Sequence, residues 1–585
     1  MSLLDTASLI VTPNAYKEGK LYSVIPSDGS GDFTFTRATT ATRVNSDGLV
    51  ELVPYNLLSY SEDFSNGYWT KTNATITTNT TDAPNFTLTA DTITDNATNG
   101  QHKVQTAALS GLVTGASFVA SAYIKANTAT RACVYAYGTS LGVGVDLLTG
   151  NQITVSGITN ASAGQVTITN VGNGWYYIEL RATVAGAFSI AIMMVSGTDF
   201  SYAGSGNSLY YWGAQLVEGA NALPYQKTET RLNIPRIDYS LGGCPNILLE
   251  PQRTNLLRQS SSFDNSAWLK SNTTIIPNDT TAPNGTLTAD KLYPTSSGNF
   301  RHIRQSAFSP YTGLNTMSIY AKKAELSNLT LVDYDGSGAG INFNLNNGVA
   351  TDYATTPFVS YSMTAVGDGW YRCIATALNG YFYWMVTDGG NSLAVTANGT
   401  DGIYIWGAQL EAGTSPTSYI PTTSASVTRN LETVVKTGAT ALIGQTEGTI
   451  FLECAIPNQG SATRRLFSLS DGTTNNAILI QNVSNSTQIQ FVVVNGGAID
   501  VAITVTSAFT FGQMFKVAVA YANNDFVIYI NGVQVGTDTS GTIPTTSKIA
   551  FDRGNDTTHF EGFMKTAVLW KERLTNDQLA QLTTI

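Results

Sequence analysis

The chain offers few side chains for acid–base, nucleophilic or metal chemistry. It has only three histidines, His102, His302 and His559, and none lies in an HExxH zinc motif or beside a GxSxG serine motif. His102 and His302 fall at near-equivalent points of two similar segments. The simpler interpretation of each histidine is a side chain satisfied by local hydrogen bonds. We therefore expect none of the three to be catalytic.

Paired carboxylates are a second route to catalysis, because glycoside hydrolysis needs two carboxyl groups about 5–10 Å apart. The sequence contains no E-x-D-x-x-E run of the kind found in such enzymes. Glu453 is isolated, and Asp500 and Asp525 lie at expected turns or strand ends. We expect a protein that is not an enzyme.

One polar loop has the composition of a cation site. Residues 551–559 read FDRGNDTTH and bring together Asp552, Asn555 and Asp556. Carboxylate and carbonyl oxygens are the ligands that Ca²⁺ prefers. These three residues are the candidate calcium ligands, with an ordinary polar loop as the alternative. No other cofactor is expected.

Aromatic side chains are the natural candidates for binding sugars, because a sugar's C–H face packs on an exposed ring. In residues 381–386, YFYWMV, alternate side chains point to opposite faces of a strand, and residues 135–137, YAY, alternate in the same way. Core packing or a subunit interface would explain these rings equally well. The candidate carbohydrate contacts are Tyr381, Tyr383, Trp384, Tyr135 and Tyr137.

An internal repeat organises the elements that carry these residues. Residues 56–91 and 255–290 are identical at 21 of 36 positions without a gap, at an offset of 199. The match extends upstream, so each repeat includes a lead-in segment. The upstream matches are Arg37 with Arg236 and Glu51 with Glu250. Six tryptophans occupy repeated positions, and we expect them in the cores: Trp69, Trp268, Trp175, Trp370, Trp212 and Trp406.

Short segments that alternate apolar and polar residues, broken by Gly and Asn, predict strands joined by tight turns. One short helix is expected at the C-terminus, capped by Thr575. The predicted fold is all-β, with three tandem antiparallel β-sandwich (jelly-roll) domains after a short N-terminal segment. The predicted boundaries are 1–34 for that segment, 35–231 and 232–429 for the two repeats with their lead-ins, and 430–585 for an unrelated third domain.

Composition excludes several classes of protein. Charged residues make up 12% of the chain and the net charge is −10, which argues against nucleic-acid binding. No apolar run approaches the length of about 20 residues that spans a bilayer, and the N-terminus does not read as a signal peptide. The four cysteines are widely spaced, so we expect them reduced.

Several motifs resemble known families. The opening NLL…F…W, the GDGWYR at 367–372 and the YIWGAQLEAGTSPTSYIPT at 404–422 make the two repeats similar to the carbohydrate-binding-module-like jelly rolls of phage tail proteins. The lead-in RIDYSLGGCPNILLEPQRTNLL at 236–257 is similar to a segment of phage tail and fibre proteins. Residues 445–585 resemble the concanavalin-A-like (laminin-G-like) jelly roll, through VAVAY at 517–521 and VIYINGV at 527–533.

The resemblance implies a structural bacteriophage virion protein, a tail or fibre component assembled in the host cytoplasm, that attaches to host-surface glycans. A purely architectural or decoration protein and, less favoured, a polysaccharide-degrading tailspike are the alternatives. We expect a homo-oligomer, with a trimer favoured, and no membrane insertion. Contact with other virion proteins is expected through the N-terminal segment, whose Leu9, Ile10, Val11, Tyr16 and Tyr22 would pack on a partner.

Overall fold

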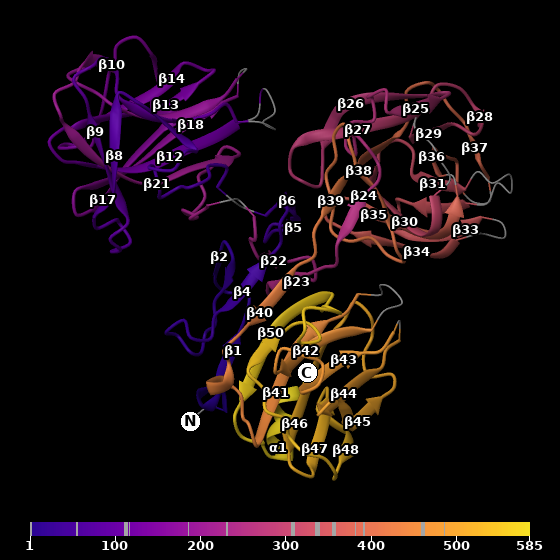
Figure 1. The fold of residues 1–585 in the computed structure, drawn as a ribbon. Helices are drawn as coiled ribbons and strands as arrows, with labels where there is room; N and C mark the ends of the chain where they lie inside the picture. Colours follow the sequence, from indigo (N-terminus) through magenta and orange to yellow (C-terminus); the bar gives the residue numbers. More distant parts are fainter. Residues whose placement is uncertain are drawn as a thin grey trace. The chain divides into compact units, whose positions relative to one another are not determined.

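The computed structural model divides the chain into two compact units, of which unit 2 is Pro54–Leu232 and unit 1 is Met1–Val53 with Asn233–Ile585 (Figure 1). Each unit is considered by itself. Almost every element is a strand, so the all-β prediction is confirmed. The structure describes residues 3–53, 56–109, 115, 117–184, 187–229, 232–305, 311–333, 340–353, 358–380, 382–389, 392–457, 463–484 and 486–585.

Unit 2 is the first jelly roll, two antiparallel sheets packed over one apolar core. One sheet has the order β15 (Asn151–Ile153), β14 (Leu141–Asp146), β13 (Arg131–Tyr137), β19 (Ser189–Met194), β11 (Lys103–Thr106) and β7 (Trp69–Thr72), with β16 (Thr159–Asn160) beside β14. The other has the order β17 (Val166–Gly172), β18 (Trp175–Thr183), β12 (Ser117–Ala126), β21 (Ser208–Glu218), β9 (Ala90–Asp95) and β8 (Ala74–Thr81).

The second jelly roll, in unit 1, repeats this strand order. One sheet runs β33 (Val349–Tyr353), β32 (Gly340–Asn344), β31 (Asn328–Asp333), β36 (Phe382–Val386), β29 (His302–Gln305) and β25 (Trp268–Ser271). The other runs β34 (Phe358–Ala365), β35 (Trp370–Gly380), β30 (Tyr311–Lys323), β38 (Ile403–Ala412), β27 (Leu287–Pro294) and β26 (Thr273–Thr281). The sequence repeat is therefore a repeat of one sandwich.

Equivalent buried groups make equivalent bonds in the two sandwiches. Asp91 accepts hydrogen bonds from the backbone N–H groups of Phe64 and Asn79, at 2.9 and 3.0 Å. Asp290, 199 residues later, accepts the same pair of bonds at 2.8 and 2.9 Å. All six repeated tryptophans are buried, as predicted. Duplication has thus preserved the groups that hold the sandwich together.

The C-terminal jelly roll has a third and separate core. One sheet has the order β22 (Arg236–Asp238), β23 (Asn246–Leu249), β50 (Gly562–Trp570), β41 (Glu447–Ala455), β46 (Met514–Ala522), β47 (Asp525–Ile530) and β48 (Val533–Asp538). The other has the order β2 (Tyr16–Lys17), β3 (Lys20–Leu21), β4 (Phe33–Thr36), β40 (Thr433–Lys436), β49 (Lys548–Ala550), β42 (Arg464–Ser470), β43 (Ala477–Asn482), β44 (Ile489–Asn495) and β45 (Ala498–Val505).

The N-terminal segment belongs to these two sheets. β1 (Leu9–Val11) pairs antiparallel with β50, and β4 pairs with β40 (Figure 1). Leu9 and Val11 are fully buried in the core of the C-terminal jelly roll, and Ile10 is also buried. The expectation that these three side chains pack on a partner protein is therefore wrong, because the chain's own last domain covers them. Tyr16 and Tyr22 are half-buried.

Both lead-ins pack forward, on the domain that follows the repeat they introduce. The first lead-in forms a hairpin of β5 (Thr42–Val44) and β6 (Val50–Leu52), and Val50 joins a buried cluster of the second jelly roll. The second lead-in places β22 and β23 against β50 of the C-terminal jelly roll. The second lead-in thus adds strands to a sheet of the C-terminal jelly roll, while the first packs on the second jelly roll as a separate two-stranded hairpin.

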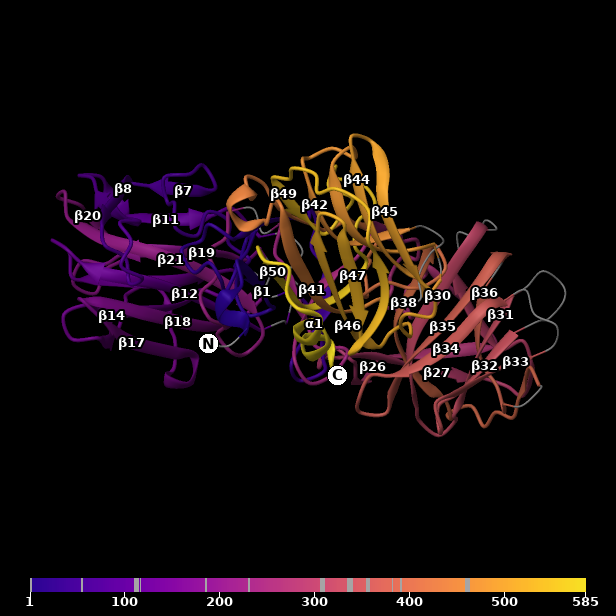
Figure 2. The same ribbon diagram turned by 90° about the horizontal axis from the view of Figure 1, so that it is seen from below.

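The C-terminal helix was predicted correctly. α1 (Asn576–Thr583) begins after Thr575, whose hydroxyl accepts from the N–H of Gln578, and it packs on β46 and β47 (Figure 2). The four cysteines are free. No helix in the described part of the chain is long and apolar enough to span a membrane.

Candidate functional site

A buried cluster of charges joins the segments of unit 1. We use the term charge cluster for Arg37, Arg236, Arg429, Glu250 and Glu432, each at most 6% exposed. Arg37 and Arg236, the equivalent arginines of the two lead-ins, converge on one carboxylate. Glu432 Oε1 accepts from Arg37 Nη1 at 2.6 Å and from Arg236 Nε at 2.8 Å, while Arg236 Nη2 donates to Oε2.

Glu250 is the second carboxylate of the charge cluster. Its Oε2 lies 2.7 Å from both Arg236 Nη1 and Arg429 Nη1, and its backbone N–H donates to Glu432 Oε2 at 2.9 Å. Burial would raise the pKa of Glu250, but the two guanidinium groups outweigh burial and hold the pKa at about 2. The Arg236 and Arg37 guanidinium groups likewise lower the pKa of Glu432 against the effect of burial. Both glutamates are therefore charged at neutral pH.

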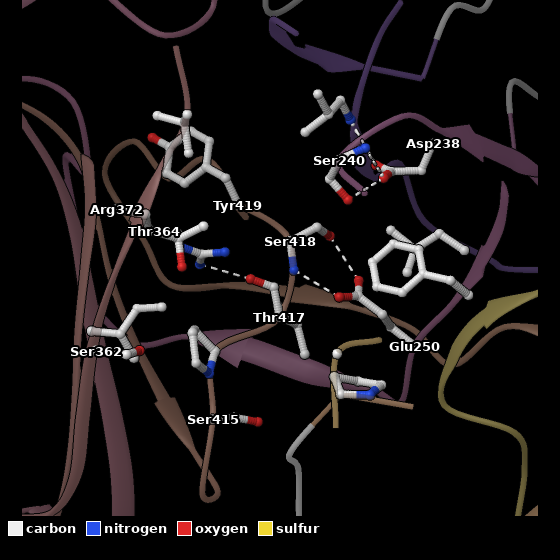
Figure 3. A pocket seen from close by; sticks show the side chains of 18 of the residues that line it. Asp238, Ser240, Glu250, Ser362, Thr364, Arg372, Ser415, Thr417, Ser418 and Tyr419 are labelled. Carbon is white, nitrogen blue, oxygen red and sulfur yellow. Dashed lines mark hydrogen bonds between the residues drawn. The ribbon is translucent and has the colours of Figure 1, made fainter. Parts of the chain in front are cut away.

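A cavity of about 570 Å³ lies against the charge cluster, entirely within unit 1 (Figure 3). Its floor is the outer face of the β34–β35 sheet. Alternation along a strand places Ser360, Ser362 and Thr364 of β34 on this face, together with Arg372, Ile374 and Thr376 of β35. The intervening residues of β35 point into the core, where Cys373, Ala375 and Ala377 are fully buried.

The loop after β38 and the first lead-in form the walls of the cavity. Arg372 Nη2 donates to the carbonyl oxygen of Thr417 at 2.7 Å and to Ser318 Oγ at 3.0 Å (Figure 3). Arg372 Nε and Ser415 Oγ are buried and have no hydrogen-bond partner among the described residues. Two cavity-lining residues therefore each carry one buried polar atom that is unpaired within the described part of the chain.

The two carboxylates at the cavity wall are already bonded within the protein. Asp238 accepts from the N–H and Oγ of Ser240 at 2.8 and 2.5 Å and from the Val44 N–H at 2.8 Å. Glu250 accepts from the N–H and Oγ of Ser418 at 2.8 and 2.7 Å (Figure 3). The lining also includes the rings of Tyr320, Tyr361, Tyr419, Phe511 and Phe563. Hydroxyls, two guanidinium groups and several rings suit a polyhydroxylated ligand of a few sugar units.

Tyr383 and Trp384, which the sequence predicted as sugar contacts in the second jelly roll, do not line this cavity. Tyr381 is outside the described residues. Trp384 is only 3% exposed and packs in the core, so its prediction as a sugar contact is wrong: its face of β36 lies against the core of the sandwich. Tyr383 is on the opposite face, 9% exposed, and its ring stacks on His302 at 4.4 Å. Its ring face is therefore already used by the imidazole.

Tyr135 and Tyr137 lie together on β13 in unit 2. Their ring centroids are 4.6 Å apart in an edge-to-face arrangement, and Tyr135 is buried in a side cluster of the sandwich. The Tyr137 hydroxyl donates to Gln101 Oε1 at 3.0 Å, and Lys103 Nζ lies 4.4 Å from its ring centroid. Half-buried Tyr137 is the more accessible of the two, and these partners fix its position.

Each predicted calcium ligand already accepts a hydrogen bond within the C-terminal jelly roll, that of Asp552 coming from the Gly554 N–H. Asp556 Oδ1 accepts from Lys548 Nζ at 2.8 Å, and Asn555 Oδ1 accepts from the Thr557 hydroxyl at 2.6 Å. Asp552 is buried, and burial raises its pKa. No group of three or more His, Cys, Asp or Glu side chains placed to hold a metal occurs in the described part of the chain.

Carbonyl oxygens lie within hydrogen-bond distance of His102 and His302. Both ring nitrogens of His102 lie within hydrogen-bond distance of backbone carbonyls, and His302 Nδ1 lies 3.1 Å from the Phe300 carbonyl oxygen. His559 Nδ1 is buried without a partner among the described residues, 4.0 Å from Asp552 Oδ2.

The cavity residues themselves were missed from sequence. One signal was present: Arg372 replaces Tyr177, its counterpart in the first repeat, inside an otherwise matching GWY segment. A position at which the two repeats carry different residues, such as Arg372 and Tyr177, is one at which the two domains have different neighbours.

Comparison with known proteins identifies the last domain. The family model described as the concanavalin A-like lectin/glucanases superfamily matches residues 429–580. The C-terminal jelly roll is thus a concanavalin-A-like, laminin-G-like domain, as the sequence predicted. None of the curated proteins matches the chain.

Several solved structures are similar to part of the chain. The CBM40 of the Ruminococcus gnavus IT-sialidase, bound to α2,3-sialyllactose, is 17% identical over 25% of this chain and 87% of that chain, with a TM-score of 0.23. The NanB sialidase from Streptococcus pneumoniae is 12% identical over 26% of each chain, with a TM-score of 0.23. The heptameric SAP-like pentraxin from Limulus polyphemus is 17% identical over 23% of this chain and 68% of that chain, with a TM-score of 0.19.

Proposed function

We propose that the chain is a structural protein of a bacteriophage virion, a tail or fibre component, that binds host-surface glycans without cleaving them. The cavity on the β34–β35 sheet carries the glycan-binding part of this proposal. Its volume of about 570 Å³ falls within the roughly 300–1,000 Å³ of small-molecule sites. The virion setting is supported by the resemblance of the lead-in at 236–257 and of the segment at 404–422 to phage tail proteins.

The bonding of the carboxylates supports binding rather than hydrolysis. A glycosidase needs one carboxylic acid to protonate the leaving group and a second carboxylate to assist attack. Glu250 is held ionised by two arginines, and Asp238 has hydrogen bonds on both oxygens. Incubating the full chain with host polysaccharide should therefore release no new reducing ends, and release of such ends would contradict the proposal.

A glycan array with the full chain tests the binding site. Thr364, whose side chain makes no hydrogen bond to a described residue, lines the cavity, so Thr364→Trp should fill it and weaken glycan binding at least tenfold. Thr169→Trp is the matched control, because Thr169 occupies the equivalent position opposite Tyr177 on β17 of the first jelly roll. Equal binding by both variants, or no binding by the unmodified chain, would contradict the cavity assignment.

An architectural role is the second candidate, and the charge cluster favours it. Five buried charged side chains from three separate stretches of sequence serve to fix domains together. Absence of glycan binding by both the isolated chain and the particle would select this candidate.

The proposed setting is the virion, with assembly in the host cytoplasm. Weak binding modules gain strength when several act together, which favours a homo-oligomer, and we propose a trimer. Mass measurement of the native assembly tests the copy number. Other virion proteins are the proposed partners. Half-buried Tyr16 and Tyr22 remain candidate contacts in the N-terminal segment, and crosslinking within particles would test them.

A further inference from the structure

The second jelly roll holds a hairpin on a face that the first jelly roll also possesses. The β5–β6 hairpin is fixed there by two hydrogen bonds to backbone carbonyls. The Val50 N–H donates to Pro283 O at 2.9 Å, and Thr42 Oγ1 donates to Tyr419 O at 2.5 Å. Val50 packs with the aromatic cluster that includes Tyr320 and Tyr419. The hairpin therefore combines directional bonds with burial of apolar surface.

In the first jelly roll the two equivalent carbonyl groups accept no hydrogen bond from a described residue. Pro84 O and Tyr225 O, the counterparts of the two acceptors, receive no hydrogen bond from any described residue. Tyr123 and Tyr225 are half-buried, whereas their counterparts Tyr320 and Tyr419 are each 4% exposed. Among the described residues of unit 2, none makes the hydrogen bonds to these carbonyls that the hairpin makes in the second jelly roll. The first jelly roll thus keeps both anchor points and the aromatic face without an occupant of its own.

One substitution distinguishes the two faces. A Cβ added at Gly285 would lie 3.0 Å from Leu49 Cδ1 of the hairpin. The first repeat has Phe86 at this position, with a positive φ of 63° and 80% of its surface exposed. A side chain as large as Leu49 would collide with Phe86. The occupant of the first face must therefore carry a small residue at that point, and its docking would cover the exposed ring.

The chain cannot supply this occupant from its own lead-ins. The first hairpin is committed to the second jelly roll. Its repeat counterpart, residues 241–251, includes the whole of β23, which pairs with β50. The lead-ins thus supply one β5–β6 hairpin, while the two jelly rolls have two equivalent faces. A second copy of the chain would add one more hairpin and two more faces, so it would not supply the missing occupant.

We propose that the face formed by Pro84, Phe86, Tyr123 and Tyr225 docks a β-hairpin of a different polypeptide. That hairpin resembles residues 41–52 of this chain: a β-branched residue on each strand, an Asx-Gly turn, and a small residue in place of Leu49. This inference does not depend on the proposed glycan cavity, which lies in unit 1.

Hydrogen–deuterium exchange on the full chain tests the docking face. The probes are cyclised peptides of residues 41–52, one unmodified and one with Leu49→Gly. The glycine peptide should protect segments 83–90 and 222–228 and leave 42–52 unchanged. Phe86→Gly, which places glycine at a positive φ and so should fold, should bind the unmodified peptide at least tenfold more tightly than the parent chain does.

Two results would overturn the proposal. One is protection confined to 282–287, which would mean that the peptide merely replaces the chain's own hairpin. The other is no binding of either peptide by the Phe86→Gly chain. Glycan binding is measured separately, so loss of one activity leaves the other standing.

Discussion

Glu250 and Glu51 hold the same place in the two lead-ins but have different surroundings. Glu250 is buried between two arginines, whereas Glu51 pairs with Arg43 at 2.9 Å with 30% of its side chain exposed. Removing one partner of a buried ion pair leaves an uncompensated charge and costs about 3–5 kcal/mol, while exposed pairs contribute about 0–1 kcal/mol. In urea titrations, Glu250→Gln should lower the free energy of unfolding by about 3–5 kcal/mol. Glu51→Gln should lower it by only about 0–1 kcal/mol. Equal effects would contradict the role of the charge cluster.

Asp91 should make the free energy of unfolding depend on pH in a direction that follows from its pKa. Burial raises its pKa to about 6, above the value of about 3.9 in an unfolded chain. Between these values the folded state holds the proton more tightly, so this group's contribution to the free energy of unfolding falls as the pH rises from about 4 to 6. Asp91→Asn should remove that slope in urea titrations at pH 4, 5, 6 and 7. Asp290→Asn should do the same in the second jelly roll, and unchanged slopes would refute the assignment.

Single residues were the hardest feature to predict from sequence. Alternation correctly placed Tyr383 and Trp384 on opposite faces, but it did not show that both faces of β36 are buried, because that depends on neighbours distant in sequence. The charge cluster was also hidden, although its repeated Arg37 and Arg236 were visible, because Glu432 lies nearly 200 residues beyond the second arginine and outside the repeat.

At the scale of elements, β1 is the clearest test of the observed fold. Leu9 is fully buried against the C-terminal jelly roll, so Leu9→Ala should lower the free energy of unfolding by about 2–5 kcal/mol. Leu4 is 44% exposed, and Leu4→Ala should change the free energy of unfolding by less than about 0.5 kcal/mol. Urea titrations give both values. If Leu9→Ala behaves like Leu4→Ala, the N-terminal strand is not part of the core.

Strand content, the duplicated sandwich and the capped helix followed from the sequence because each is encoded by neighbouring residues or by a repeat. The integration of β1 and β4 did not, because their partners β50 and β40 lie hundreds of residues away. An apolar N-terminal strand looks the same whether its partner is another protein or the far end of its own chain.

The molecule as a whole has one domain inserted into another compact unit. Unit 1 resumes at Asn233 after ending at Val53, so unit 2 is an insertion. Excision of residues 54–232, with a short Gly-Ser linker, should leave a protein that unfolds cooperatively by circular dichroism. Excision of 256–426 should not, because it removes Thr417 and Ser418, whose hydroxyl groups hydrogen-bond to Arg429 and Glu250 of the charge cluster. Cooperative unfolding of both, or of neither, would contradict this division.

The pairing of Leu9 with Leu569 has a consequence for biosynthesis. At translation rates of about 5–20 residues per second, the strand at the start of the chain waits roughly half a minute to two minutes for its partner. During that time it is an unpaired apolar edge on a nascent polypeptide, while the sandwich of unit 2 is assembled from contiguous residues behind it. The pairing of these two distant strands therefore forms late, and chaperone demand should concentrate on β1 and β50.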